Sequence, residues 1–353
     1  MLDFYLNDVS YGFLKPYLIA EIGVNHGGDL QRAKKLIQLA HQGGAHAAKF
    51  QTYKADKLAS KETAPAYWDT AEEPTSTQHE LFSKYDGFGE KEYSELADYC
   101  RQLGIDFLST PFDLEAVDLL DPLMPLFKIA SADLTNVPLL RKVGAKKKPV
   151  LMSVGASSHQ EISNSVSILK SAGATQITLL HCVLNYPTPK QHAQLAQIPV
   201  LIEKFGKDLS IGYSDHVRPN DDGTMPALEI AALAGARVIE KHFTDDKTAK
   251  GNDHYHAMNS EDLSVFKQKL ADYELLQGGP ELDLDVQKTA IGNARRRISA
   301  SKQISAGSEI REDSMIALRG NQGLEISKWD LVIGKTATRD IAKGESISEA
   351  DFS

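Results

Sequence analysis

Reactive side chains end an apolar segment of the sequence at residues 238–243, VIEKHF. Side chains alternate between the two faces of a strand, so Glu240 and His242 are predicted to share one face while Lys241 points to the other. A strand end that frays into solvent would also tolerate these charges. If the segment instead ends inside a cavity, the carboxylate and the imidazole can act on one ligand.

Seven other short apolar runs end in the same way, with hydrogen-bonding or ionisable residues at or just after the last apolar position. The main residues at these ends are Glu21, Lys49, Gln51, Thr110, Lys128, Ser131, Ser153, His181, Ser214, Asp215 and His216. A single ending of this kind means little, because turns favour serine and aspartate. Eight of them indicate one shared functional rim.

Two lysines, Lys49 and Lys128, lie inside apolar runs, where an unpaired ammonium group would be costly. We therefore expect each of them to meet an anion. The hydroxyl groups that would complete a cradle for phosphate and carboxylate belong to Thr110, Ser131, Ser153 and Ser214. The alternative is a structural ion pair between either lysine and Glu21 or Glu240 in the barrel core.

Two histidines, His216 and His242, follow consecutive runs that would be neighbouring strands in a closed barrel. Their imidazoles could share one divalent cation with open positions for water and substrate. Since no cysteine accompanies them, the pair favours an exchangeable ion such as Mn²⁺ over structural zinc. Two satisfied core histidines are the alternative. Either Glu21 or Glu240 could accept a proton near the ion.

The elements that must position these residues alternate between apolar runs and amphipathic helical segments. The runs are residues 17–22, 47–51, 106–110, 126–131, 149–154, 177–182, 209–214 and 238–243. This alternation predicts an α/β fold with a parallel sheet, and eight strands can close into a (β/α)8 TIM barrel. An open doubly wound sheet is the alternative. In a barrel, the reactive groups would collect at the C-terminal ends of the strands.

The chain is predicted to contain a barrel domain over residues 1–277, a linker over 278–297 and a small β-rich domain over 298–353. The last domain holds two similar hairpin-like segments, RISASKQISAGSEI and KTATRDIAKGESIS. A long connection at residues 53–90 is predicted to cover the site, since loops of this length are usually functional or disordered.

Composition excludes several classes of function. A formal charge of −9 over 353 residues argues against nucleic-acid binding. No apolar run reaches the roughly 18 residues needed to cross a bilayer, and the first residues do not resemble a secretory signal, so no membrane partner is expected. Two cysteines, Cys100 and Cys182, suit a reducing compartment and predict a cytoplasmic protein.

Motifs across the barrel closely resemble the sialic acid (N-acetylneuraminate) synthase family, which includes the legionaminic and pseudaminic acid synthases. The matching stretches are AEIGVNHGGDL, AAKFQTY, FLSTPFD, FKIASADLTN, PVLMSVGA, LLHCVLNYPTP, IGYSDHV and VIEKHFT. The tail from Ile298 to Ser353 resembles the antifreeze-like (SAF) domain of the same family. The resemblance implies a transferase that condenses phosphoenolpyruvate with an N-acylated hexosamine, such as N-acetylmannosamine, and water. The products would be a nine-carbon 2-keto sugar acid (a nonulosonic acid) and phosphate.

The resemblance also implies roles for individual residues. His216 and His242 match the Mn²⁺ ligands, and Glu21 and Glu240 match acids beside the reacting centre. The residues that match the phosphoenolpyruvate cradle are Lys49, Thr110, Lys128, Ser131, Ser153 and Ser214. The residues that match sugar contacts are Gln51, Tyr186 and Asp253. Arg319 matches an arginine that contacts the N-acyl group across a domain-swapped homodimer.

Three features depart from the family pattern. Arg-Gly-Asn at residue 319 replaces the usual Arg-Pro-Gly, and the asparagine expected at Leu184 is displaced to Asn185, which alternation would place on the other face. The loop PAYWDTAEEPTSTQ also differs, which favours a modified acceptor sugar. Two other functions stay open: a lysine Schiff-base aldolase that uses Lys49 or Lys128, and a non-catalytic sugar-binding protein.

Overall fold

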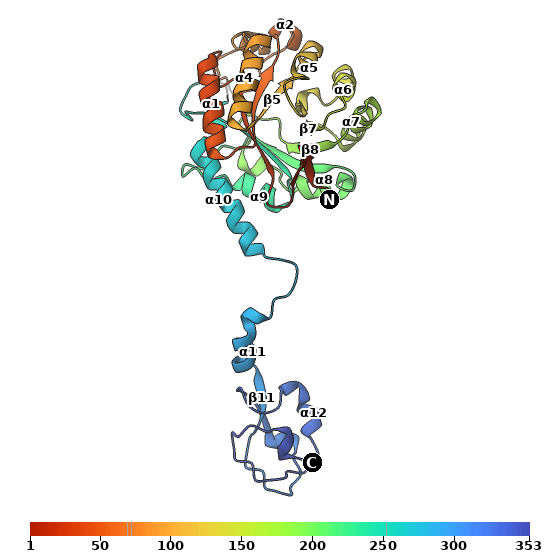
Figure 1. Cartoon of the computed structure of the whole chain (residues 1–353), viewed down its shortest axis with the longest axis vertical. Helices are drawn as coiled ribbons and strands as arrows, with labels where there is room; N and C mark the ends of the chain where they lie inside the picture. The colour runs from red at the N-terminus through yellow and green to blue at the C-terminus, as the bar shows by residue number, and fades with distance from the viewer. Residues whose placement is uncertain (69, 72, 252) are drawn as a thin grey trace. The chain divides into compact units, whose positions relative to one another are not determined.

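The computed structural model describes residues 1–353 except Asp69, Glu72 and Asn252. Of these three positions outside the described residues, Asp69 and Glu72 fall in the segment predicted to cover the site, and Asn252 falls in the segment after residue 243. The chain divides into two compact units, Met1–Gln277 and Gly278–Ser353 (Figure 1). Each unit is described by itself.

The first unit contains a parallel sheet of eight strands, and each strand falls on one of the predicted apolar runs. The strands are β3 (Tyr17–Gly23), β4 (Ala47–Thr52), β5 (Asp106–Pro111), β6 (Phe127–Ile129), β7 (Val150–Ser153), β8 (Ile177–Cys182), β9 (Ser210–Asp215) and β10 (Val238–His242). Their order is β5-β4-β3-β10-β9-β8-β7-β6. The strands that come first and last along the chain, β3 and β10, pair directly. Since β5 and β6, at the two ends of this order, also pack beside each other, the sheet forms a nearly closed barrel. The TIM-barrel prediction is confirmed.

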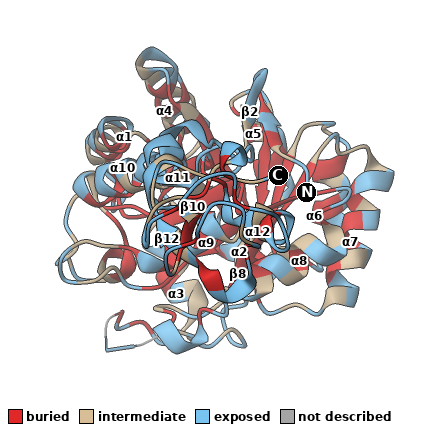
Figure 2. Cartoon of the chain, turned by 90° about the horizontal axis from the view of Figure 1, so that it is seen from below, coloured by how far each residue is buried: buried red, intermediate tan, exposed pale blue. Residues whose placement is uncertain are grey.

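Helices surround the barrel and bury one side against it (Figure 2). They are α1 (Leu30–Gly43), α4 (Glu90–Leu103), α5 (Leu114–Leu120), α6 (Val137–Gly144), α7 (His159–Ala172), α8 (Gln197–Phe205), α9 (Pro226–Leu233) and α10 (Ser260–Gln277). The ends of α1 follow from local chemistry. The Asp29 carboxylate accepts hydrogen bonds from the N–H groups of Gln31 and Arg32, and Gly44 ends the helix with a φ of 89°.

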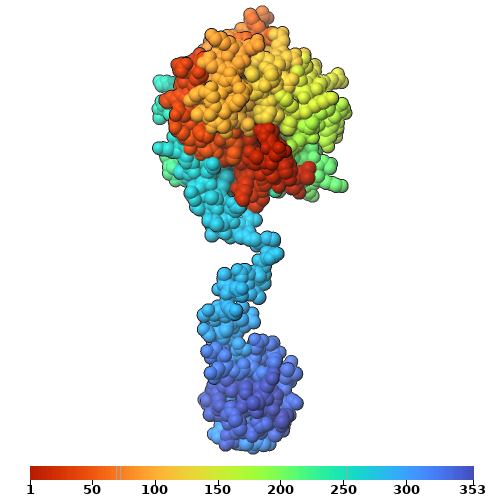
Figure 3. Space-filling view, viewed as in Figure 1, coloured from red at the N-terminus to blue at the C-terminus, as the bar shows by residue number. Residues whose placement is uncertain are grey.

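An N-terminal hairpin, β1 (Phe4–Leu6) and β2 (Val9–Tyr11), was not predicted from the sequence. Ser210, the first residue of β9, donates a hydrogen bond to the Asp3 carbonyl at 2.9 Å, and Arg237, just before β10, binds the Asp3 carboxylate at 2.9 Å. The hairpin therefore covers the N-terminal ends of these strands, and Figure 3 shows the first residues in deep red on the surface of this unit. The C-terminal ends remain for the site.

The second unit is a small β-rich fold with its own apolar core. It contains α11 (Lys288–Ala294), β11 (Arg296–Ala300), β12 (Met315–Arg319) and α12 (Trp329–Val332). The predicted linker thus includes a helix and the start of a strand. The two similar segments pair with each other, through a bridge between Ile304 and Ile341, rather than forming separate hairpins. Among the described residues, no helix is both long and apolar enough to cross a membrane.

Candidate functional site

One cavity at the C-terminal ends of the strands is lined by most of the predicted residues of the barrel unit. Its volume is about 1040 Å³ including its open mouth. The predicted residues that line it are Glu21, Lys49, Gln51, Thr110, Lys128, Ser131, Ser153, Tyr186, Ser214, His216, Glu240, His242 and Asp253. Two residues of the predicted rim do not line it: His181 Nε2 lies 2.9 Å from the Ala193 carbonyl, and Asp215 accepts a hydrogen bond from Lys241 at 2.6 Å. Arg319 lies at the end of β12 in the second unit. Segments far apart in the sequence are therefore brought together as the barrel prediction requires.

Strand register places the charged residues side by side. Glu21 lies opposite His242 on one neighbouring strand and opposite Lys49 on the other. The register then shifts between Glu21 and Gly23, a β-bulge at which Gly23 has a φ of 54°. A Cβ atom on Gly23 would lie 3.3 Å from Gln51 Nε2. The bulge thus leaves room for the Gln51 amide to donate a hydrogen bond to Glu21 Oε1 at 3.0 Å.

Two lysines and two glutamates form a buried charged group at the base of the cavity. Lys49 Nζ lies 2.5 Å from Glu21 Oε2 and 3.5 Å from Glu240 Oε2. Lys128 Nζ lies 3.5 Å from Glu240 Oε1. These are the ion pairs named above as the alternative to anion binding. The two contacts of Glu240 are longer than a charge-assisted hydrogen bond of about 2.8 Å, so both ammonium groups keep capacity for a bound anion.

The protein environment drives the pKa values of these groups apart. Burial raises the pKa of Glu21. Burial also acts to raise the pKa of Glu240, but the charges of Lys128 and Lys49 outweigh it and lower that pKa. Burial lowers the pKa of Lys128, whereas for Lys49 the two carboxylates outweigh burial and raise the pKa. Two carboxylates with opposite shifts can serve as proton donor and proton acceptor.

Hydroxyl groups around the lysines differ in how far they are satisfied. Thr110 Oγ1 accepts a hydrogen bond from Lys49 at 3.1 Å, and Ser131 Oγ accepts one from the Gly155 N–H at 3.0 Å. Ser153 Oγ is buried and has no hydrogen-bond partner among the described residues. A buried hydroxyl without a partner is costly, so Ser153 is available to a ligand.

A cluster of histidines occupies another wall of the cavity. The ring centroids of His216 and His242 are 5.5 Å apart, and His216 Nδ1 lies 2.9 Å from the Val183 carbonyl. Donation from that nitrogen would leave Nε2 of His216 free to bind a ligand. The sequence interpretation missed His256, whose ring lies 4.9 Å from that of His242. The one available signal was its position three residues after Asp253.

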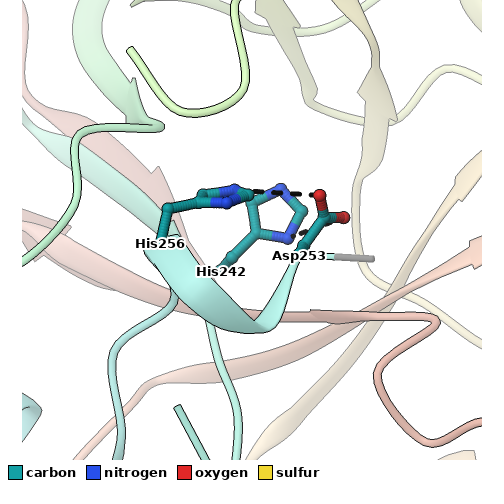
Figure 4. A group of neighbouring side chains, drawn as sticks. All are labelled: His242, Asp253 and His256. Atoms are coloured by element: carbon teal, nitrogen blue, oxygen red, sulfur yellow. Dashed lines mark ion pairs between the residues drawn. The ribbon is translucent and has the colours of Figure 1, made fainter. Parts of the chain in front are cut away.

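The carboxylate of Asp253 lies close to the rings of both His242 and His256. Its Oδ2 lies 3.3 Å from His242 Nδ1, and its Oδ1 lies 3.8 Å from His256 Nε2 (Figure 4). Burial lowers the pKa of His216 to about 4 and that of His242 well below its usual value, so both rings are neutral near pH 7. Burial raises the pKa of Asp253 to about 7. Neutral imidazoles beside a carboxylate are a donor set that suits a divalent cation.

The long connection after β4 supplies an apolar wall. This connection contains α2 (Ala55–Leu58) and α3 (Gln78–Ser83). Its apolar and aromatic residues that line the cavity are Tyr53, Tyr67, Trp68, Leu81, Phe82 and Tyr85. These residues of the segment line the cavity, in keeping with the predicted cover of the site. Leu184 also lines the cavity, whereas Asn185 is exposed and is not among the lining residues.

Comparisons with known proteins identify the family. The NeuB family model matches residues 36–281, and the SAF domain model matches residues 295–353. The N,N'-diacetyllegionaminic acid synthase of Campylobacter jejuni is 36% identical over 342 residues, which cover 95% of this chain and 99% of the relative. The enzyme of the same name from Legionella pneumophila is 34% identical over 338 residues, which cover 94% and 93%.

Solved structures give the same result. The crystal structure of N-acetylneuraminic acid synthetase from Leptospira borgpetersenii, in complex with citrate, matches with a TM-score of 0.70 and 30% identity. The match covers 82% of this chain and 95% of that structure. These findings confirm the resemblance seen in the motifs. The chain belongs to the NeuB family and ends in a SAF domain.

Proposed function

We propose that this protein is a transferase that condenses phosphoenolpyruvate with an N-acylated hexosamine and water, releasing phosphate and a nonulosonic acid. The observation that carries the proposal is the single cavity in which two buried ammonium groups, two carboxylates and a histidine cluster meet. Phosphoenolpyruvate has a phosphate and a carboxylate, which match the two ammonium groups. Relatives named as synthases of legionaminic acid support the same product class.

The lysines and hydroxyl groups bind and orient phosphoenolpyruvate. Lys49 and Lys128 hold its anionic groups, and the unpartnered hydroxyl of Ser153 donates a hydrogen bond to one of them. This fixes C3 of phosphoenolpyruvate against the aldehyde carbon of the open-chain sugar, where the new carbon–carbon bond forms. Water then adds to C2, and the bond between C2 and the phosphate oxygen breaks, releasing inorganic phosphate.

The two glutamates move the protons of this reaction. Glu21, whose pKa is raised, donates a proton to the aldehyde oxygen as the carbon–carbon bond forms. Glu240, whose pKa is lowered, accepts a proton from the water that adds to C2. A divalent cation, for which we propose Mn²⁺ at His216 and His242, would supply Lewis-acid polarisation of the aldehyde.

We further propose that the acceptor sugar carries no phosphate. Among the described barrel residues that line the cavity, the only lysine or arginine side chains are Lys49 and Lys128, which the proposal assigns to phosphoenolpyruvate. A sugar phosphate would require additional cationic partners. The aromatic wall that includes Tyr67 and Trp68 instead favours an acceptor with apolar faces and acylamino substituents. Gln51, Tyr186 and Asp253 remain the proposed polar contacts of the sugar.

The proposal includes that the protein is a homodimer in the cytoplasm. In a domain-swapped dimer, Arg319 of the SAF domain would bind the N-acyl oxygen of a sugar in the partner's barrel. Cys100 and Cys182 are both buried and free of disulfide bonds, which suits a reducing compartment.

A phosphate-release assay with purified protein, phosphoenolpyruvate and Mn²⁺ tests the proposal. The acceptors are N-acetylmannosamine, its 6-phosphate and dideoxy diacetamido hexoses. We expect phosphate release only when an acceptor is present, its loss after chelation, and a higher kcat/KM for an unphosphorylated sugar. Failure with every acceptor would contradict the condensation, and preference for the 6-phosphate would contradict the acceptor assignment.

One observation favours a second candidate, a Schiff-base aldolase. Burial lowers the pKa of Lys128, which would favour its neutral, nucleophilic form. Borohydride added with a 2-keto sugar acid would then reduce a covalent adduct on Lys128, and mass spectrometry would detect it. Activity that resists chelation, together with such an adduct, would replace the metal-dependent condensation with this candidate.

A further inference from the structure

We propose that Asp253 and His256 are additional protein ligands of the divalent cation proposed at His216 and His242. Two imidazoles and one carboxylate, from His242, Asp253 and His256, then hold the ion beside His216. This set goes beyond the pair of histidines predicted from the sequence, and it gives Asp253 a role in metal binding in place of the proposed sugar contact. It rests on the proposed use of a cation in this cavity and specifies which side chains bind it.

The geometry of the three side chains is close to that of a metal site. One ligand atom from each of them lies within 4.8 Å of the others. Two atoms bound to one ion at about 2.1 Å can be at most roughly 4.2 Å apart. The Asp253 carboxylate, at 3.3 Å from His242 and 3.8 Å from His256, already meets this limit. A shift of well under 1 Å in the rings would close the set, and Figure 4 shows the carboxylate beside both rings.

Burial supplies a second, independent observation. His256 is 0% exposed, and neither of its ring nitrogens has a hydrogen-bond partner among the described residues. A buried polar group left unsatisfied costs roughly 1–3 kcal/mol. The neighbouring His254 differs, because its Nδ1 lies 2.8 Å from Thr244 Oγ1. Thus His254 has a structural partner, whereas His256 offers nitrogens that a cation would satisfy.

The backbone holds His256 in a fixed relation to β10. The short 3-10 helix η3 (His254–His256) leads into a bridge between Phe243 and Met258, in which the Met258 N–H donates to the His242 carbonyl at 2.8 Å. His242 and Asp253 line the cavity, while His256 is not among its lining residues. The cation would therefore lie at the cavity wall, with His256 behind it and open positions facing the substrates.

Metal binding to the full-length protein tests this set without the reaction. Chelator-treated protein is titrated with Mn²⁺ in the absence of substrates, and free Mn²⁺ is measured by electron paramagnetic resonance. We expect His256→Gln and Asp253→Asn each to raise the Kd for Mn²⁺ by about 10-fold to 100-fold. His254→Gln is the matched control and should stay within about threefold of the unsubstituted protein. Melting curves without metal verify that each variant is folded.

The outcomes separate this inference from the proposed function. A Kd for folded His256→Gln within threefold of the unsubstituted protein would overturn the role of His256 and leave the condensation untouched. Absence of Mn²⁺ binding to the unsubstituted protein would overturn both. Crystals of the unsubstituted protein soaked in Mn²⁺ give a test that needs no variant: anomalous density should lie about 2.2 Å from a His256 nitrogen. Density more than 3 Å away would refute the assignment.

Discussion

At the scale of single residues, Glu240 has the most informative position because it faces both ammonium groups. Glu240→Gln keeps the shape of the side chain but removes its charge. We expect kcat to fall at least about 100-fold, since the proposed proton acceptor is lost. The KM for phosphoenolpyruvate should fall severalfold, because a carboxylate that competes for Lys49 and Lys128 is gone. Steady-state phosphate release measures both constants.

The matched control is Glu203→Gln, which changes an exposed glutamate on α8 and should leave both constants within about twofold. A Glu240→Gln enzyme with a kcat near that of the unsubstituted protein would contradict the role of Glu240.

Cavity residues such as Lys49, Ser153 and His242 were predictable because they lie at the ends of apolar runs, and strand ends converge in a barrel. Tyr186 and Asp253 were found only through the family resemblance. Sequence reasoning could not decide whether Lys49 meets a core acid or a ligand anion. The structure shows that Lys49 pairs with Glu21 at 2.5 Å. Its longer 3.5 Å contact with Glu240, which leaves capacity for an anion, depends on side-chain distances that sequence does not give. His256 was missed because its approach to His242 depends on the path of a loop, which side-chain alternation does not predict.

At the scale of elements, Asp245 ties helix α1 to the loop after β10. Its two carboxylate oxygens lie 2.9 Å from the side-chain nitrogens of Arg32 and Lys35. Burial acts to raise the pKa of Asp245, but these two cations outweigh it and lower the pKa. A folded-state pKa below the unfolded value of about 3.9 stabilises the fold above that value. This stability is lost as the pH falls through the folded-state pKa.

We therefore expect Asp245→Asn to reduce the free energy of unfolding by about 1 kcal/mol near pH 7, a modest value because Lys35 is largely exposed. Near pH 3 the difference from the unsubstituted protein should shrink. Denaturant unfolding of the barrel at both pH values measures it, with Asp221→Asn, at an exposed site, as the control. An equal loss at both pH values would show that the contribution is not electrostatic.

The elements themselves were predictable to different degrees. Barrel strands such as β8 (ITLLHC) are continuous apolar runs because both faces are buried, and such runs are easily recognised. The hairpin β1–β2 was missed because each strand has only three residues, too few for an alternating pattern to be recognised. Helix α11 was missed because it has no apolar stripe, and all of its residues are at least partly exposed.

At the scale of the whole molecule, the proposed role of Arg319 depends on where this residue lies in the SAF domain. Arg319 lies opposite Arg296 in the antiparallel pair β11–β12, and both residues are exposed. Two like charges facing each other across a ladder are unfavourable. Arg296 Nη1 donates to the Ala317 carbonyl at 3.1 Å, and an oxygen-bearing partner would satisfy Arg319 in the same way. The sequence suggested the N-acyl oxygen of a sugar as this partner only through the family resemblance. Residue spacing within one chain does not indicate whether a separate domain contacts its own barrel or the barrel of another subunit.

Mixed dimers decide whether Arg319 acts across the dimer. A tagged Arg319→Ala chain and a differently tagged Lys49→Met chain are expressed together, and dimers carrying both tags are purified. If Arg319 reaches the partner's barrel, the intact Lys49 of one chain and the intact Arg319 of the other meet in one site. At acceptor concentrations near KM the mixed dimer should then have about half the activity of the unsubstituted dimer. If Arg319 serves its own barrel, each chain carries one defect, and activity should not exceed half that of the Arg319→Ala dimer.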